Sequence, residues 1–314
     1  MRAITLFTST VNRCLGASFT EACKRNGIEL TLHTARENYK QTFNANYNIL
    51  SWGVKMPKWW YDRKGKNVCF LENGLFCQKE GIWIDAGGWF ADSNLSRERH
   101  FRVKQSAKAW HRVRQIAKRF FGWEFWQGGK PDGPIMFAVQ RNRDAPCQFH
   151  FPRQNKHLGA LESSIKLLSE HCPDRPVAIR PHPRFVREWK ANEPNLEKYF
   201  RPDWTIDYSP RVYATLRECS ALVTVNSTLA TEALFLGMPV ATLGNSAFTG
   251  SNVTLECGAD PARLAGLFDF EPQQEPIKRY LGACMRHQLQ YNLDTDGILE
   301  NREFQRWLER VEDR

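Results

Sequence analysis

The 314-residue sequence has no uninterrupted apolar run of about 18 residues, the length that a membrane-spanning helix needs. Its opening residues, Met1 to Thr8, contain too short an apolar stretch for a signal peptide and are typical of a first β-strand. Internal repeats and low-complexity tracts are absent as well. We therefore expect no membrane span and a location in the cytoplasm.

Cysteine spacing argues against two further classes. The nine cysteines are an odd number and never occur as C-x-x-C, so the sequence indicates neither a disulfide framework nor a zinc site. We expect reduced thiols, most of them buried.

What is present is an alternation of short apolar runs with helical patterns, in a chain long enough for two α/β domains of about 150 residues. This alternation predicts parallel sheets covered by helices on both faces. The expected strands are 3–7, 48–52, 68–71, 135–139, 177–179, 221–225 and 240–243. The expected helices are 18–26, 105–120, 158–171 and 212–219.

The clearest linker signal is the Gly- and Pro-rich stretch 128–134. It places a domain boundary near residue 130, with a first domain of residues 1–130 and a second of residues 131–275. The remaining residues, 276–314, have helical spacing and no strand signal.

The most informative segment, 219–250, predicts a βαβ unit. Its first strand ends in a polar turn that leads directly into a helix. The first-turn N–H groups and the dipole of such a helix form an anion site that suits the phosphates or ribose of a nucleotide. The same residue types are also common helix caps that bind nothing. The polar residues at this junction are Asn226, Ser227, Thr228 and, one turn further on, Glu232.

A second polar strand end follows the apolar run 177–179. There a proline-fixed turn carries His182 between Arg180 and Arg184. Guanidinium groups match phosphate oxygens in bidentate geometry, so this turn suits a pyrophosphate or a phosphosugar.

Four ordered segments give the chain a resemblance to a known family. The first is 51–55 with the strand end Glu72-Asn-Gly, and the second is 81–95, which is similar to D-x-x-G-x-y-x-D-x-x-S-x-L. The third is Gln140 with Asp144, which is similar to Q-x-x-x-D, and the fourth is the pair of strand ends described above. Over residues 50–250 this set resembles the capsule polysaccharide biosynthesis family, whose best-known members are retaining β-Kdo transferases. The stretch 248–252 departs from the family's Y-x-G-W-G, which indicates a changed site.

The resemblance implies a nucleotide-sugar-dependent glycosyltransferase with an α/β fold of the GT-B type. It implies two Rossmann-like domains facing a central cleft, with a C-terminal helical segment that crosses back and packs on the first domain. Ligands of open α/β sheets lie beyond the carboxyl ends of the strands. We therefore expect the acceptor on the side of the first domain and the nucleotide sugar in the second.

The expected site residues gather at these strand ends. We expect Glu72 and Asp144 to act as acid/base and nucleophile-like groups, in an order that the sequence leaves open, with His182 as a third catalytic candidate. Each carboxylate has a plainer interpretation, as a turn residue for Glu72 and as the partner of a neighbouring arginine for Asp144. The residues expected to bind the nucleotide sugar are Gln140, Arg180, His182, Asn226, Ser227, Thr228 and Glu232.

None of these strand ends carries the D-x-D spacing of metal-dependent glycosyltransferases. We therefore expect metal-independent transfer, with the nucleotide sugar as co-substrate and no other cofactor. Asp85 and Asp92 are expected to be turn residues rather than catalysts.

The net charge of +10 is concentrated between Arg97 and Arg119, where nine Lys or Arg residues occur with one acid, Glu98. Surface helices ordinarily mix both signs, so we expect this segment to bind a polyanion, with a merely solvated helix face as the alternative. The residues concerned are Lys104, Lys108, Arg112, Arg114 and Lys118.

Three functions remain open. The first in order is glycosylation of a hydroxymethylated pyrimidine in DNA, as phages perform in the host cytoplasm. The basic segment would follow phosphates, and aromatics such as Trp59, Trp60, Trp123 and Trp126 could hold a flipped base, with ordinary core or linker packing as the alternative for these tryptophans. The second is transfer to a capsule or lipopolysaccharide glycan, which the resemblance implies most directly. The third is a non-catalytic nucleic-acid-binding protein on a degenerate transferase scaffold.

Overall fold

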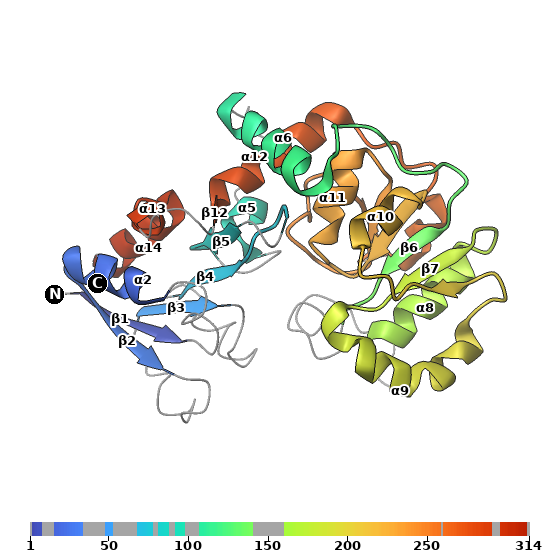
Figure 1. Ribbon diagram of the computed structural model, residues 1–314, viewed down its shortest axis with the longest axis horizontal. Coiled ribbons are helices and arrows are strands. Elements are labelled where there is room, and N and C mark those ends of the chain that lie inside the picture. Colours follow the sequence, from blue (N-terminus) through green and yellow to red (C-terminus); the bar gives the residue numbers. More distant parts are fainter. Residues whose placement is uncertain are drawn as a thin grey trace. The chain divides into compact units, whose positions relative to one another are not determined.

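The computed structural model describes residues 2–7, 16–33, 48–52, 68–77, 81–87, 92–97, 107–140, 160–258, 260–290 and 296–312 (Figure 1). The chain divides into two compact units, one formed by residues 1–100 with 283–314 and the other by residues 101–282. Each unit contains a six-stranded sheet. No helix within the described ranges is long and apolar enough to cross a membrane.

These limits differ from those expected from the sequence, where the first domain ends at residue 130 and the C-terminal segment begins at 276. The basic helix, α6 (Ala107–Phe121), belongs to the second unit, whereas the sequence places it in the first domain. As limits of an acceptor-side and a donor-side domain, 1–130, 131–275 and 276–314 remain predictions.

The sheet of the first unit is mixed and has the order β12-β5-β4-β3-β1-β2. Its strands β1 to β4 pair in parallel, whereas β5 runs antiparallel to β4, and β12 runs antiparallel to β5. The prediction of no strand in 276–314 is therefore wrong, because β12 is the short polar sequence Gln-Leu-Gln and carries no apolar signal. The strands are β1 (Arg2–Phe7), β2 (Ile28–His33), β3 (Asn48–Trp52), β4 (Val68–Asn73), β5 (Gly81–Asp85) and β12 (Gln288–Gln290).

The C-terminal segment completes the core of the first unit. Phe304 and Trp307 share one buried cluster with Cys69, Leu71 and Ile84 of the sheet. The expected return of the C-terminal segment to the first domain is thus present in the structure. The helices of this unit are α2 (Gly16–Arg25), α5 (Asn94–Arg97), α13 (Asp296–Leu299) and α14 (Arg302–Glu312), and α12 (Gln274–His287) contributes residues to both units.

The sheet of the second unit is parallel throughout, with the order β11-β10-β9-β6-β7-β8. Counted along the chain this is the order 3-2-1-4-5-6 of a Rossmann sheet. Its strands are β6 (Ile135–Ala138), β7 (Val177–Arg180), β8 (Thr205–Ile206), β9 (Ala221–Thr224), β10 (Val240–Thr242) and β11 (Leu255–Glu256). Its further helices are α8 (Ala160–His171), α9 (Val186–Leu196), α10 (Val212–Arg217) and α11 (Leu229–Leu236), with short 3₁₀ turns at Pro183–Phe185, Glu197–Tyr199 and Pro261–Gly266.

The four central strands of this sheet are buried along their whole length. This is the pattern of a parallel sheet covered on both faces. One face places Phe137 and Val223 in a cluster with Ile165 of α8 and Trp189 of α9, and α11 packs against β9 and β10. All seven expected strands and all four expected helices occur, each with ends within two residues of the prediction.

The glycine-rich stretch 128–134 is not a flexible connection but a packed segment of the second unit. The Lys130 N–H donates to the carbonyls of Arg217 and Cys219, both at 3.0 Å. A Cβ on Gly129 would lie 2.1 Å from the Cys219 carbonyl oxygen, and one on Gly133 would lie 2.1 Å from that of Glu218. These glycines therefore permit the close approach of two backbone segments, which their composition alone does not distinguish from a linker.

We predict that Gly237→Ala lowers the stability of the second unit by more than the cost of placing alanine in a left-handed backbone conformation. Gly237 ends α11 with φ of 79°, and a Cβ there would lie 2.8 Å from the Trp126 ring. Strain and overpacking together should cost about 2–4 kcal/mol. Gly122→Ala is the matched control, because its φ is 66° and no atom of the described part of the chain lies within 4 Å of the added Cβ. Equal losses for both variants in urea unfolding would show that Trp126 imposes no constraint.

Candidate functional site

The second unit has a topological switch point between β6 and β9. These neighbouring parallel strands send the chain to opposite sides of the sheet, the geometry at which α/β proteins bind ligands beyond the strand ends. β6 ends at Ala138 and β9 at Thr224. The predicted donor-binding residues Gln140 and Asn226 follow these two ends and are joined by hydrogen bonds.

Two hydrogen bonds connect this pair directly. Gln140 Nε2 donates to Asn226 Oδ1, and the Asn226 backbone N–H donates to Gln140 Oε1, both at 2.7 Å. Thr224 Oγ1 also donates toward Gln140 Oε1 at 3.3 Å. The structure therefore brings together two of the predicted residues that lie 86 positions apart in the chain.

The turn after Asn226 uses its backbone N–H groups locally. The N–H of Ser227 donates to Thr224 Oγ1 at 3.2 Å, and that of Leu229 donates to Ser227 Oγ at 3.3 Å. The next two N–H groups, of Ala230 and Thr231, donate to carbonyls of the same turn. The sequence argument expected such groups to be open for an anion, and the structure shows these four engaged.

Exposure separates the residues of this turn. Asn226 and Thr228 are buried, whereas Ser227 between them is partly exposed. The Ser227 hydroxyl accepts from Leu229, which leaves its own O–H able to donate to a phosphate oxygen. Glu232 is only 2% exposed and accepts the Thr231 hydroxyl at 2.9 Å, so contact with a ribose would require α11 to open.

The turn after β7 also divides its predicted residues. Arg180 is 7% exposed, pairs with the Asp207 carboxylate, and donates to the Ser209 carbonyl at 2.6 Å. Its guanidinium is therefore occupied by the protein. His182 is partly exposed, and its carbonyl accepts the Phe185 N–H at 2.7 Å.

Two of the predicted residues, Asp144 and Lys104, lie outside the described residues. Glu72 is the penultimate residue of β4, opposite Trp83 of β5, and the structure does not describe its side chain. The pairing of Glu72 with the donor site thus remains a prediction.

The basic helix α6 presents fewer cations than its sequence suggests. Lys108, Arg114 and Lys118 are exposed, as predicted. Arg112 is half-buried, and burial lowers the pKa of its guanidinium. Its part in binding a polyanion, like that of the exposed basic residues of α6, remains a prediction.

Sequence reasoning missed a carboxylate at the same edge of the sheet. Glu256 ends β11 and accepts the Gly250 N–H at 2.7 Å. Burial raises the pKa of its carboxyl, and the Gly250 hydrogen bond and the nearby Arg263 oppose that rise. A two-residue strand gives too weak a pattern for the sequence to indicate where this residue lies.

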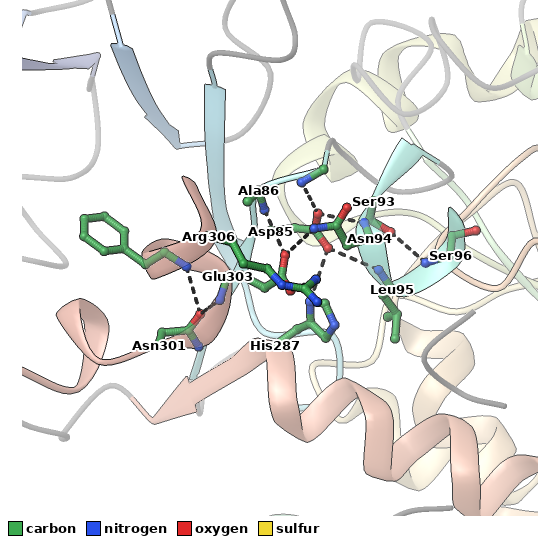
Figure 2. A network of polar contacts seen from close by, with 12 residues as sticks. Asp85, Ala86, Ser93, Asn94, Leu95, Ser96, His287, Asn301, Glu303 and Arg306 are labelled. Carbon is green, nitrogen blue, oxygen red and sulfur yellow. Dashed lines mark hydrogen bonds and ion pairs between the residues drawn. The ribbon is translucent and has the colours of Figure 1, made fainter. Parts of the chain in front are cut away.

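A buried polar network in the first unit was also missed (Figure 2). Asp85 is fully buried at the end of β5, and its Oδ1 accepts the N–H groups of Gly87 and Asn94, both at 2.8 Å. His287 Nδ1 lies 3.2 Å from Asp85 Oδ2. Asp85 does organise a turn, as expected, but it also connects that turn to the C-terminal segment.

Glu303 extends the network. Its carboxylate accepts hydrogen bonds from the Asn94 side chain and from the Ala86 N–H, and Arg306 Nη1 lies 3.3 Å from Glu303 Oε1. Asp85, His287 and Glu303 each place a potential metal-ligand atom within 4.8 Å of the others. The donors of the protein already satisfy both carboxylates, so the arrangement is explained without a metal.

The expectation of metal-independent transfer rests only on the strand ends considered. A D-x-D spacing does occur elsewhere, at Asp294 and Asp296. Asp294 lies outside the described residues, and Asp296 begins α13. Metal independence therefore remains a prediction.

The comparisons with known proteins agree with this geometry. The sequence profile of a family described as "Capsule polysaccharide biosynthesis protein" matches residues 127–292, more than half of the chain and including the whole switch point. The chain belongs to this family. No curated protein matches it.

Two solved structures from Thermosulfurimonas dismutans show the same fold as this family member. KpsC described as a β-Kdo 2,7 transferase has a TM-score of 0.60 at 15% identity, covering 95% of this chain and 99% of that one. KpsC described as a β-Kdo 2,4 transferase has a TM-score of 0.55 at 14% identity, covering 90% of each chain. The protein therefore has the GT-B-like α/β fold that the resemblance implies.

We predict that Asp85→Asn strongly destabilises this capsule-family protein. Asparagine keeps one oxygen for the N–H groups of Gly87 and Asn94, but its NH2 group would face the Leu95 N–H and His287 Nδ1, which lie 3.3 and 3.2 Å from Asp85 Oδ2. Leaving the buried Leu95 donor without its acceptor should cost about 1–3 kcal/mol. Asp92→Asn serves as the control, since Asp92 pairs with the exposed Arg97 in the same segment and should contribute at most about 1 kcal/mol. The comparison requires urea unfolding of both variants, and equal stabilities would contradict a supporting role for Asp85.

A further prediction concerns Arg180→Ala, a variant that would mainly weaken donor binding if Arg180 contacted the donor as the sequence suggests. The variant should lose about 3 kcal/mol of stability, because it leaves the largely buried Asp207 carboxylate unpaired. Arg201→Ala, which breaks the exposed pair with Asp203, is the control and should be nearly neutral. A folded, fully stable Arg180→Ala protein that no longer binds the donor would restore the original interpretation.

Proposed function

We propose that the protein is a nucleotide-sugar-dependent glycosyltransferase that acts on an anionic glycan of the capsule or lipopolysaccharide type. The observation that carries this proposal is the polar switch point of a 3-2-1-4-5-6 sheet, within the residues that match the capsule family. The fold shared with the two KpsC transferases supports it.

The donor is proposed to bind at the carboxyl ends of β6, β7 and β9. Gln140, His182 and Ser227 are the partly exposed residues among those predicted to bind the donor. The Gln140 carboxamide is hydrogen-bonded to Asn226 through both its nitrogen and its oxygen, so Ser227 and His182 are the proposed direct contacts to the donor phosphates. Gln140, Asn226 and Thr228 are proposed to support these contacts, and Glu232 and Arg180 to stabilise the surrounding structure.

Glycosyl transfer needs charge stabilisation of the leaving phosphate and removal of a proton from the acceptor hydroxyl. A hydroxyl and an imidazole at the phosphates suit the first requirement. Glu72 and Asp144 are proposed for the acid/base and nucleophile-like roles, and His182 for proton transfer to the leaving group. No metal is included in this proposal.

The order of acceptors reverses the one that the sequence suggests. Membership of the capsule family favours a glycan, whereas nothing in the comparisons supports DNA. Trp123, considered for holding a flipped base, is 3% exposed and packs on Phe121 and Tyr213. The exposed cations of α6 are proposed to bind acidic groups of the glycan, because Lys and Arg form ion pairs with carboxylates as well as with phosphates.

The test has two stages. Thermal-shift measurements with UDP-, GDP-, CDP- and CMP-activated sugars identify the donor, because a ligand of the native state raises the melting temperature. The selected donor is then incubated with a Kdo-terminated oligosaccharide and, separately, with hydroxymethylated DNA, and the products are analysed by mass spectrometry. Sugar transfer to DNA alone would overturn the glycan assignment, and binding without any transfer would favour the non-catalytic alternative.

We predict that Ser227→Ala lowers donor affinity by more than the change in folding explains. Loss of its local hydrogen bond should cost about 1 kcal/mol of stability, and loss of a phosphate contact should lower affinity about tenfold. Ser220→Ala is the control, because Ser220 lies at the opposite end of the same strand and donates to Pro134 at 3.4 Å. Reduced stability with unchanged affinity would show that Ser227 only caps the helix.

A further inference from the structure

The amide side chains of Gln140 and Asn226 form a directed chain across the switch point. Asn226 Nδ2 donates onward to the Asn245 carbonyl at 3.2 Å. The chain of hydrogen bonds therefore links the segments that follow β6, β9 and β10. It begins at Gln140 and ends on the backbone after β10.

Backbone groups at the two ends fix the direction of these amides. The Asn226 N–H can only donate, so the atom of Gln140 that faces it is the oxygen. Gln140 Nε2 must then face Asn226 Oδ1, which turns Asn226 Nδ2 toward the Asn245 carbonyl, a group that can only accept. Both amides are thus held in one orientation, and neither can be replaced by an acid without placing two acceptors in contact.

Burial excludes Asn226 from contact with a ligand. Its exposed fraction is 0%, and both ends of its carboxamide are hydrogen-bonded. Ser227, the next residue, is partly exposed, and its N–H is held by Thr224 Oγ1 at 3.2 Å. What the amide chain fixes is therefore the position of Ser227.

We propose that Gln140 and Asn226 are positioning residues that hold the Ser227 turn for the donor phosphates, and that the buried Asn226 makes no contact with the donor. This proposal rests on the proposed function. It separates the buried Asn226 from the partly exposed Ser227 among the predicted donor-binding residues, which their residue types alone do not do.

Gln140→Glu is the decisive variant. It keeps the shape of the side chain but sets a carboxylate oxygen against Asn226 Oδ1, where the two atoms now lie 2.7 Å apart. Nucleotide affinity at neutral pH should fall about tenfold or more, because a buried acceptor loses its donor and faces another acceptor. When pH falls and the new carboxyl group becomes protonated, its O–H can donate to Asn226 Oδ1, so the affinity of the variant should recover toward that of the unchanged protein.

Gln288→Glu provides a matched control in the other unit. Gln288 is also fully buried, and its amide bridges the backbone N–H and carbonyl of Phe76 at 3.0 and 2.6 Å. The same chemical change there should lower stability and leave the nucleotide affinity of the folded fraction unchanged.

Calorimetry with UDP, CDP and CMP, from low to neutral pH, measures the affinities of the three proteins. Hydrogen exchange of the segment 222–231 is measured alongside and needs no ligand. Faster exchange in Gln140→Glu but not in Gln288→Glu, with affinity that recovers on acidification, is the expected result. Unchanged exchange in Gln140→Glu, or an affinity loss that no pH restores, would overturn the positioning role. If the unchanged protein binds none of the nucleotides, the proposed function fails, while the exchange data still decide whether Gln140 holds the turn.

Discussion

The need to satisfy polar backbone groups where β6 and β9 diverge governs the chemistry of the second unit. Strands paired along their length separate at their carboxyl ends, and an N–H or C=O that loses its ladder partner there must find another. Gln140 supplies an acceptor to the Asn226 N–H, and Thr224 supplies one to that of Ser227. An apolar side chain at either position would leave a buried donor unsatisfied, at a cost of about 1–3 kcal/mol. The switch point is therefore polar before any ligand is considered, and the proposed donor site lies at the residues that meet this requirement.

The sequence predicted the strands and helices well, but it did not predict the directions of the polar side chains at their ends. Apolar runs and helical spacing are local signals, and they located every expected strand and helix to within two residues. The direction of a polar side chain depends on partners far away in the chain, such as Asp207 for Arg180 and Asn245 for Asn226. Residue types at strand ends consequently identify the neighbourhood of a site, but they do not separate the buried support from the accessible Ser227 and His182.

The first unit depends on residues from both ends of the chain. Its core joins Cys69 and Ile84 to Phe304 and Trp307, and Asp85 joins the turn after β5 to His287. Residues 81–87 and 92–95 of the family-like stretch are thereby explained as a point where the C-terminal segment attaches to the sheet. The sequence predicted the return of the C-terminal segment but not these contacts, because β12 has no apolar pattern and His287 lies about 200 residues further along the chain than Asp85.

Specificity has to arise elsewhere than in the charge of α6. A few exposed cations attract any polyanion and carry little information about which one is bound. The stretch 248–252, where this chain departs from the family's Y-x-G-W-G, differs in a more selective way. Phe248 is fully buried and lies 5.3 Å from Tyr280 between ring centroids, while Asn252 is exposed with a left-handed φ of 60°. The aromatic character that the family pattern provides is here turned into the core, and the loop presents an amide to solvent. At residues 248–252 the chain therefore offers solvent a hydrogen-bonding amide rather than an aromatic ring, a selective feature that the charge of α6 does not provide.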